Sequence, residues 1–226
     1  PSVEAAIEVA SAARRELPSL LAAELFFEEG LSLVVGHTGA SRPFAALHGA
    51  YLLLEVAAQE DPTDELVAFL GDRDDVLLAG DPAGRRRLWE LRERHTEAIA
   101  SAGIVHKLDV SLPPARLAEF VGRIGPRLEA AVPGARLILY GHIAEANLHV
   151  NVLGPAADDQ RADEAVLSLV VEMRGSISAE HGIGVAKAGW LERDRGASDV
   201  AAMRAVKHAL DPSGILNPGV LFAPPR

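Results

Sequence analysis

Apolar residues recur along this chain at two spacings, one typical of helices and the other typical of strands. Runs that follow the helical repeat predict helices over residues 2–17, 31–35, 61–70, 82–101, 114–131, 158–174 and 199–210. Short apolar or alternating runs predict strands over residues 22–27, 50–57, 76–79, 104–112, 137–143 and 147–153. Pro or Gly stands at many of the boundaries between these segments, where it ends helices and forms turns.

The order of these segments predicts an α+β fold. Helices and strands alternate, and the short connection between strands 137–143 and 147–153 implies that they are antiparallel neighbours. Residues 18–79 and 104–174 each resemble a ferredoxin-like β-α-β pass. We therefore predict a two-layer sandwich in which helices cover one face of a mostly antiparallel sheet. No obvious linker divides residues 1–226, so we interpret them as one domain.

Composition excludes several classes of protein. The chain has 22 basic and 32 acidic residues, a net charge of −10, which argues against nucleic acid or an anionic membrane as the main partner. The absence of Cys excludes disulfides, thiolate catalysis and Cys-ligated zinc. No apolar run approaches the roughly 20 residues of a membrane span, and no signal peptide is visible. We expect a cytoplasmic protein, and the start at Pro1 without Met leads us to expect a fragment or a processed product.

The candidate chemistry is concentrated in two segments, GHIAEANLHVNV (residues 141–152) and SISAEHGIG (residues 176–184). A hairpin through the first segment would bring His142 and His149 close enough to share an ion. With Glu180 from the second segment they form a two-His-one-carboxylate set, which suits a catalytic divalent metal with an open coordination position. The competing interpretation is a pair of ordinary core or surface histidines.

His181 follows Glu180 directly, so both side chains reach one site only if the chain turns there. Gly182 allows such a turn. Glu180 would then bind the metal, and His181 would stay free as a base, a task that imidazole performs well near neutral pH. The alternative is a charged helix N-terminus. Asn151 lies two residues after His149 on a predicted strand and so faces the same side.

A third group of polar residues could bind a carboxylate. Arg92 and Thr96 are four residues apart on a predicted helix and share a face, while Lys107 comes from the following strand. Spacing alone favours the alternative, an ordinary basic helix face whose Arg residues pair with acidic neighbours. The chain contains no GxGxxG, GxxxxGK[ST] or GxSxG motif, and therefore no visible dinucleotide-binding element of its own.

Four segments together resemble the C-terminal, substrate-binding domain of FAD-linked oxidases. They are GHIAEANLHVNV, SISAEHGIG with Lys187 behind it, LWELRERHTEAIASAGIVHKLDVSLP (residues 88–113) and LDPSGILNPG (residues 210–219). The likeness spans nearly the whole chain. Within the family it is strongest to the dehydrogenases of D-2-hydroxyglutarate, with those of D-lactate and the flavin subunit of glycolate oxidase as relatives.

The resemblance implies an FAD-dependent enzyme that oxidises a D-2-hydroxy acid, 2-hydroxyglutarate-like or lactate-like, to the 2-oxo acid by hydride transfer to FAD. The flavin would be held mainly by an N-terminal domain that this chain lacks. Carried over by position, the implied roles are a divalent metal, usually zinc, on His142, His149 and Glu180; base function for His181; substrate binding by Arg92, Thr96, Lys107 and Asn151; and a flavin contact for Asn217.

Two departures from the family pattern affect these expectations. The usual Gly-Asp-Gly of the first motif is replaced by Ala144, Glu145 and Ala146, which restricts the turn, and Val220 stands where Lys usually follows the NPG turn. Two other hypotheses stay open: a non-haem metal enzyme (oxygenase or hydrolase), and a non-catalytic subunit that binds a metal or a hydroxy acid for a flavoprotein. The sequence identifies neither the electron acceptor nor the oligomeric state, and a homodimer is compatible with it.

Overall fold

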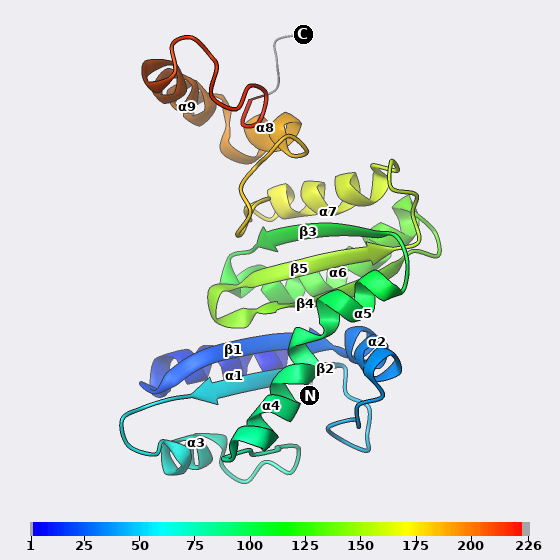
Figure 1. Ribbon diagram of the computed structural model, residues 1–226, viewed down its shortest axis with the longest axis vertical. Helices are drawn as coiled ribbons and strands as arrows, with labels where there is room; N and C mark the ends of the chain where they lie inside the picture. The colour runs from blue at the N-terminus through cyan, green and yellow to red at the C-terminus, as the bar shows by residue number, and fades with distance from the viewer. Residues whose placement is uncertain (1, 223–226) are drawn as a thin grey trace.

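The computed structural model describes residues 2–222 (Figure 1). Within this range five strands form one sheet in the order β2-β1-β4-β5-β3, and all the paired neighbours are antiparallel. The strands are β1 (Leu20–Phe27), β2 (Ala50–Val56), β3 (Val105–Ser111), β4 (Arg136–His142) and β5 (Asn147–Leu153). The predicted α+β fold with a mostly antiparallel sheet is thus confirmed.

Helices make up most of the remaining regular structure. The α-helices are α1 (Val3–Glu16), α2 (Glu28–Thr38), α3 (Thr63–Leu70), α4 (Pro82–Glu93), α5 (His95–Ser101), α6 (Leu117–Ala131), α7 (Arg161–Glu172), α8 (Leu191–Arg195) and α9 (Ala197–Leu210). Short 3-10 helices are η1 (Pro114–Arg116), η2 (Ile143–Glu145) and η3 (Ala188–Trp190). Among residues 2–222, no helix combines the length and apolar character needed to cross a membrane.

The two faces of the sheet are packed differently. Leu25, Val110 and Val150 point to the face covered by α1, α6 and α7, where they belong to the larger hydrophobic core. Phe26 and Ile138 point to the opposite face, where α2, α4 and α5 form a smaller core (Figure 1). Helices therefore cover parts of both faces, whereas we predicted helices on one face.

The second predicted β-α-β pass is present in a split form. Strands β3 and β4, which α6 connects, both pair antiparallel with β5, so they run parallel to each other with β5 between them. Residues 18–79 do not form such a pass. Strands β1 and β2 are antiparallel neighbours, and α2 is part of the connection between them.

The strand predicted over residues 76–79 is wrong. These residues form no strand. Val76, Leu77 and Leu78 instead line a hollow of about 400 Å³ beside β2, α1 and α3, and Leu77 and Leu78 are exposed. An apolar run of four residues predicts burial, but a strand also needs a partner for its backbone groups.

The single helix predicted over residues 82–101 is divided at Arg94 into α4 and α5. Arg94 has ψ near −1°, which turns the chain between the two helices. Arg92 and His95 are consequently both buried against the sheet. The helix predicted over residues 31–35 is longer than expected, because it begins at Glu28.

The buried imidazole of His95 predicts a pH-dependent stability. Its side chain is 0% exposed, and burial lowers the pKa of His95 from 6.5 to about 4. The folded state then binds fewer protons than the unfolded state between these values, so the free energy of unfolding falls as the pH drops from 6.5 to 4, by about 3 kcal/mol. We expect His95→Gln to lose this part of the pH dependence in urea unfolding curves.

Measurements at about pH 8, where imidazole is neutral in both states, give the effect of the substitution itself. Parallel stability profiles for the two proteins across the acidic range would contradict this account of His95.

Candidate metal centre

The sheet register brings the polar side chains of four strands together on the face opposite the larger core. Glu24 of β1 lies opposite His142 of β4, and His149 of β5 lies opposite both Tyr140 of β4 and Asp109 of β3. Residues that face each other across antiparallel strands lie with their side chains on the same face. Apolar residues at the alternate positions hold this register, because they are buried on the other face.

The three predicted metal-binding side chains lie together. One possible ligand atom from each of His142, His149 and Glu180 lies within 4.8 Å of the other two. The Nε2 atom of His142 and Oε1 of Glu180 are 3.6 Å apart. Ligands about 2.1 Å from a tetrahedral ion are about 3.4 Å from one another, so small side-chain movements would complete the site.

Glu180 comes from a segment that runs along the free edge of β3. Ser176 and Ser111 exchange both backbone hydrogen bonds, and the amide of Ala179 donates to the carbonyl of Asp109. Gly175 is needed at the start of this segment, because an added Cβ would lie 2.4 Å from the Ser111 carbonyl oxygen. These contacts bring Glu180 next to His142 and His149, which lie more than 30 residues earlier in the chain.

The Nδ1 atom of each imidazole in the cluster contacts a carboxylate that we did not predict from the sequence. The Nδ1 atom of His142 is 2.6 Å from Oε1 of Glu24, and Nδ1 of His149 is 2.5 Å from Oδ1 of Asp109. The His149 hydrogen bond is the main cause that lowers the pKa of Asp109. One signal was available, since Glu24 is the single charged residue in the apolar run LLAAELFF.

His181 lies beside the cluster. Its Nε2 atom is 3.2 Å from Oδ2 of Asp109, and its side chain is 71% exposed. Gly182 has φ +73°, so the chain turns directly after His181, as the sequence suggested. Lys187, which follows this turn, donates a hydrogen bond from Nζ to the carbonyl of Ile177. Burial lowers the pKa of Lys187.

Arg92 and Thr96 meet at Tyr140 despite the break between α4 and α5. The guanidinium of Arg92 lies 4.7 Å from the centre of the Tyr140 ring, and the Thr96 hydroxyl is 2.9 Å from the Tyr140 hydroxyl. Arg92 also donates through Nε to Oε2 of Glu24 at 2.7 Å, in a buried ion pair. Arg92 is therefore joined to His142 through one carboxylate.

Lys107 and Asn151 lie opposite each other on β3 and β5. Asn151 is 3% exposed, and its amide is within 3.3 Å of the His149 carbonyl. Lys107 is exposed and shares the face of Asp109, two residues further along β3. Lys107 thus lies on β3, and β5 separates this strand from β4, whose Tyr140 contacts Arg92 and Thr96.

Asn217 lies apart from the cluster. It follows α9 in the C-terminal loop, which is drawn beyond α7 and away from the strands (Figure 1). Its backbone has φ +45°, a conformation that Asn tolerates better than most residues, and it forms part of an exposed turn. The flavin contact expected of Asn217 stays a prediction.

The hairpin forms although Ala144, Glu145 and Ala146 replace Gly-Asp-Gly in its turn. Ile143 to Glu145 form the 3-10 helix η2, and Ala146 then adopts the left-handed conformation with φ +54°. For a residue with a Cβ this conformation is disfavoured by roughly 1–2 kcal/mol, which is the steric reason for Gly in the family pattern. The hairpin nevertheless closes, with His142 and His149 ring centroids 5.4 Å apart.

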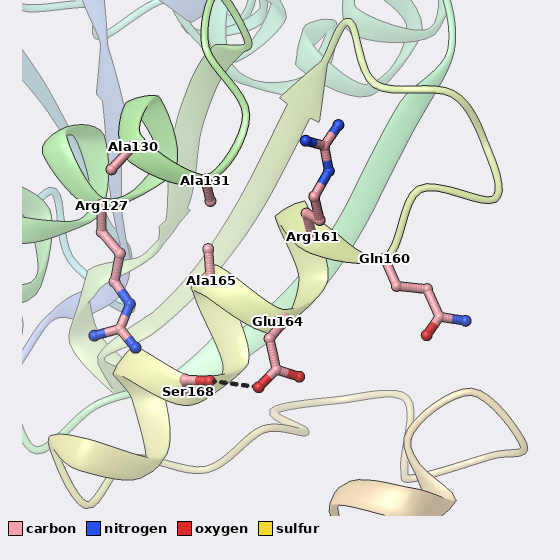
Figure 2. A pocket seen from close by; sticks show the side chains of 8 residues that line it. All are labelled: Arg127, Ala130, Ala131, Gln160, Arg161, Glu164, Ala165 and Ser168. Atoms are coloured by element: carbon pink, nitrogen blue, oxygen red, sulfur yellow. Dashed lines mark hydrogen bonds between the residues drawn. The ribbon is translucent and has the colours of Figure 1, made fainter.

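A separate hollow of about 690 Å³ lies between α6 and α7 (Figure 2). Its charged side chains are already paired: Arg127 with Glu172, Arg161 with Asp159, and Glu164 with Ser168. These helices cover the face opposite the metal cluster, so the hollow is not part of the candidate site.

The donor set fits a divalent cation. Two imidazole Nε2 atoms and one carboxylate are available, both imidazoles are supported through Nδ1, and the partly exposed side chains leave access from solvent. A cation held here can act as a Lewis acid on an oxygen of a bound molecule.

Comparison with known proteins identifies the family. The family model described as "FAD linked oxidases, C-terminal domain" matches residues 1–221, and the chain belongs to this family. The chain is 37% identical to D-2-hydroxyglutarate dehydrogenase of Xanthomonas citri over 98% of its own length and 50% of that protein. It is 34% identical to the mitochondrial D-2-hydroxyglutarate dehydrogenase of Arabidopsis thaliana, over 91% of this chain and 39% of the relative.

A mitochondrial D-2-hydroxyglutarate dehydrogenase of Bos taurus is 37% identical over 91% of this chain and 39% of its own length. The chain thus spans about half, or less, of the length of these relatives.

Gly141→Ala should disturb the hairpin that carries both histidines. An added Cβ would lie 2.2 Å from the Asn147 carbonyl oxygen and 2.9 Å from Cα of Leu148, and both are backbone atoms that cannot easily move. We expect the free energy of unfolding to fall by about 1–3 kcal/mol in chemical denaturation.

Gly122→Ala is the matched control, because this glycine lies in the exposed part of α6 with nothing within 4 Å of an added Cβ. It should be neutral or slightly stabilising. Equal stability changes in the two variants would show that the close approach at Gly141 has no energetic consequence.

Proposed function

We propose that this chain is the substrate- and metal-binding part of an FAD-dependent D-2-hydroxy acid dehydrogenase. Such an enzyme oxidises the hydroxy acid to a 2-oxo acid with hydride transfer to FAD. The observation that carries the proposal is the cluster of His142, His149 and Glu180 with His181 beside it, in a chain of the FAD-linked oxidase family. The flavin would be bound mainly by another part of the enzyme.

The metal would be held by His142, His149 and Glu180, and zinc suits two imidazoles and a carboxylate. When bound, it would stabilise negative charge on the substrate hydroxyl oxygen. His181 would take the hydroxyl proton. Its Nε2 faces Asp109, so Nδ1 is the nitrogen left to accept that proton.

Cationic groups on both sides of His149 and Asn151 support an acidic substrate. Arg92, with Thr96, lies towards β1, and Lys107 lies on β3. We propose that a substrate lying over Asn151 is held at its carboxylates by these groups. Two separated cations favour a dicarboxylate, and the relatives named above carry the name D-2-hydroxyglutarate dehydrogenase.

Zn²⁺ should stabilise the 226-residue chain through the proposed ligands. At one hundred times its dissociation constant, a ligand bound only to the folded state adds about 2.7 kcal/mol. We expect a rise in the thermal midpoint with Zn²⁺, and we expect His142→Ala and Glu180→Gln to remove most of it.

His37→Ala is the matched control, because this histidine also contacts a carboxylate, Glu97, but on the helical surface of α2. It should keep the full rise. If the wild-type chain contains no bound metal by metal analysis, and its thermal midpoint does not rise with Zn²⁺, the metal centre is excluded from the proposal.

His181→Ala should slow the oxidation of D-2-hydroxy acids by the complete flavoenzyme. Loss of a general base costs about 10²–10⁴ in rate, and we expect the loss mainly in kcat because His181 contacts no proposed substrate carboxylate group. Stopped-flow measurement of flavin reduction is the suitable assay.

Wild-type rates of flavin reduction in this variant would exclude His181 as the base. Turnover by the chain in the complete absence of flavin would instead support the non-haem metal enzyme that the sequence left open.

A further inference from the structure

Two carboxylates that are not proposed metal ligands, Glu24 and Asp109, make the same pattern of contacts. Each bridges one metal-binding imidazole to one further functional group. Glu24 contacts Nδ1 of His142 with one oxygen and Nε of Arg92 with the other, at 2.6 and 2.7 Å. Asp109 contacts Nδ1 of His149 with one oxygen and Nε2 of His181 with the other, at 2.5 and 3.2 Å.

The orientation of the imidazoles follows from these contacts. A carboxylate accepts hydrogen bonds and cannot donate them when ionised, so each Nδ1 must carry the hydrogen. The unprotonated nitrogen of His142 and His149 is then Nε2, which in His142 is the nitrogen nearest Glu180. Hydrogen bonds of this kind hold a metal-binding ring in place and raise its basicity.

The sheet makes both bridges rigid. Glu24 and Asp109 lie on β1 and β3, the strands that flank the β4–β5 hairpin on either side. The Glu24 side chain is only 5% exposed, so it has little freedom to leave Arg92 or His142.

We infer that Glu24 and Asp109 are positioning residues of the metal centre. Glu24 sets the Nε2 of His142 towards the ion and fixes Arg92 relative to it. Asp109 sets the Nε2 of His149 towards the ion and fixes His181. The inference rests on the proposed function, and it assigns to two residues the link between the ion, the base and the carboxylate-binding group.

The chain offers a matched control on the opposite face of the same strand. His106 of β3 also contacts a carboxylate, with Nδ1 3.3 Å from Oδ1 of Asp163, but it lies beside α7 and away from the cluster. Asp163→Asn removes the same kind of charge from an imidazole contact without touching the site.

The experiment measures metal binding by the 226-residue chain. The variants Asp109→Asn and Glu24→Gln keep the side-chain size and remove the charge. The affinity for Zn²⁺ is measured by competition with a chromophoric chelator, and the visible absorption of bound Co²⁺ reports the coordination geometry. We expect affinities about 10–100-fold weaker in both variants, with an altered Co²⁺ spectrum, and no change in Asp163→Asn.

Glu24→Gln leaves Arg92 without its buried partner, so this variant can lose stability for a reason unrelated to the ion. The double variant Glu24→Gln/Arg92→Met removes both charges together. It should keep the fold, measured by circular dichroism, and still bind Zn²⁺ more weakly than the wild type.

Wild-type affinity and Co²⁺ spectrum in Asp109→Asn and in the double variant would overturn the inference and leave the metal centre intact. Equal weakening in Asp163→Asn would also overturn it, since the effect would then be general. If the wild-type chain itself bound neither Zn²⁺ nor Co²⁺, the metal centre of the proposed function would fail instead.

Discussion

The antiparallel register of β1, β4, β5 and β3 is the constraint on which the site depends. Side chains alternate between the two faces of a strand, so a slip of one residue would exchange the polar and the apolar set. Leu25, Val150 and their neighbours are buried between the sheet and α1, α6 and α7. The hydrophobic effect on that face therefore decides where His142 and His149 point on the other face.

Paired charges make the polar face compatible with a folded core. An isolated buried carboxylate is strongly unfavourable, whereas one with two partners keeps most of its hydrogen bonds. Glu24 has Arg92 and His142 as partners, and Asp109 has His149 and His181. Such networks contribute little net stability, but they fix the directions of their members. The rigidity of the site thus comes from the sheet and from these contacts together.

The fold class and the hairpin that carries His142 and His149 could be predicted from local signals, whereas Glu180 was grouped with them because two imidazoles and a carboxylate form a common metal-ligand set. Apolar spacing gave most elements, and the short turn after His142 implied a hairpin. No such ligand pattern marked Glu24 and Asp109, whose contacts with His142 and His149 span 118 and 40 residues and follow from the strand register. The wrong strand over residues 76–79 has a similar cause, since an apolar run does not indicate whether a pairing strand is available.

The segment from Gly175 to Ala179 follows α7 and leads towards α8 and α9, and backbone hydrogen bonds of Ser176 and Ala179 attach it to β3. Several large apolar side chains of this C-terminal region, among them Val206, Leu210 and Ile215, are exposed. A cation bound by both the β4–β5 hairpin and Glu180 would crosslink two segments of the chain. It would thereby reduce the conformational entropy of the C-terminal region that contains α8 and α9. Binding of an ion and ordering of this C-terminal region would then be reciprocally coupled.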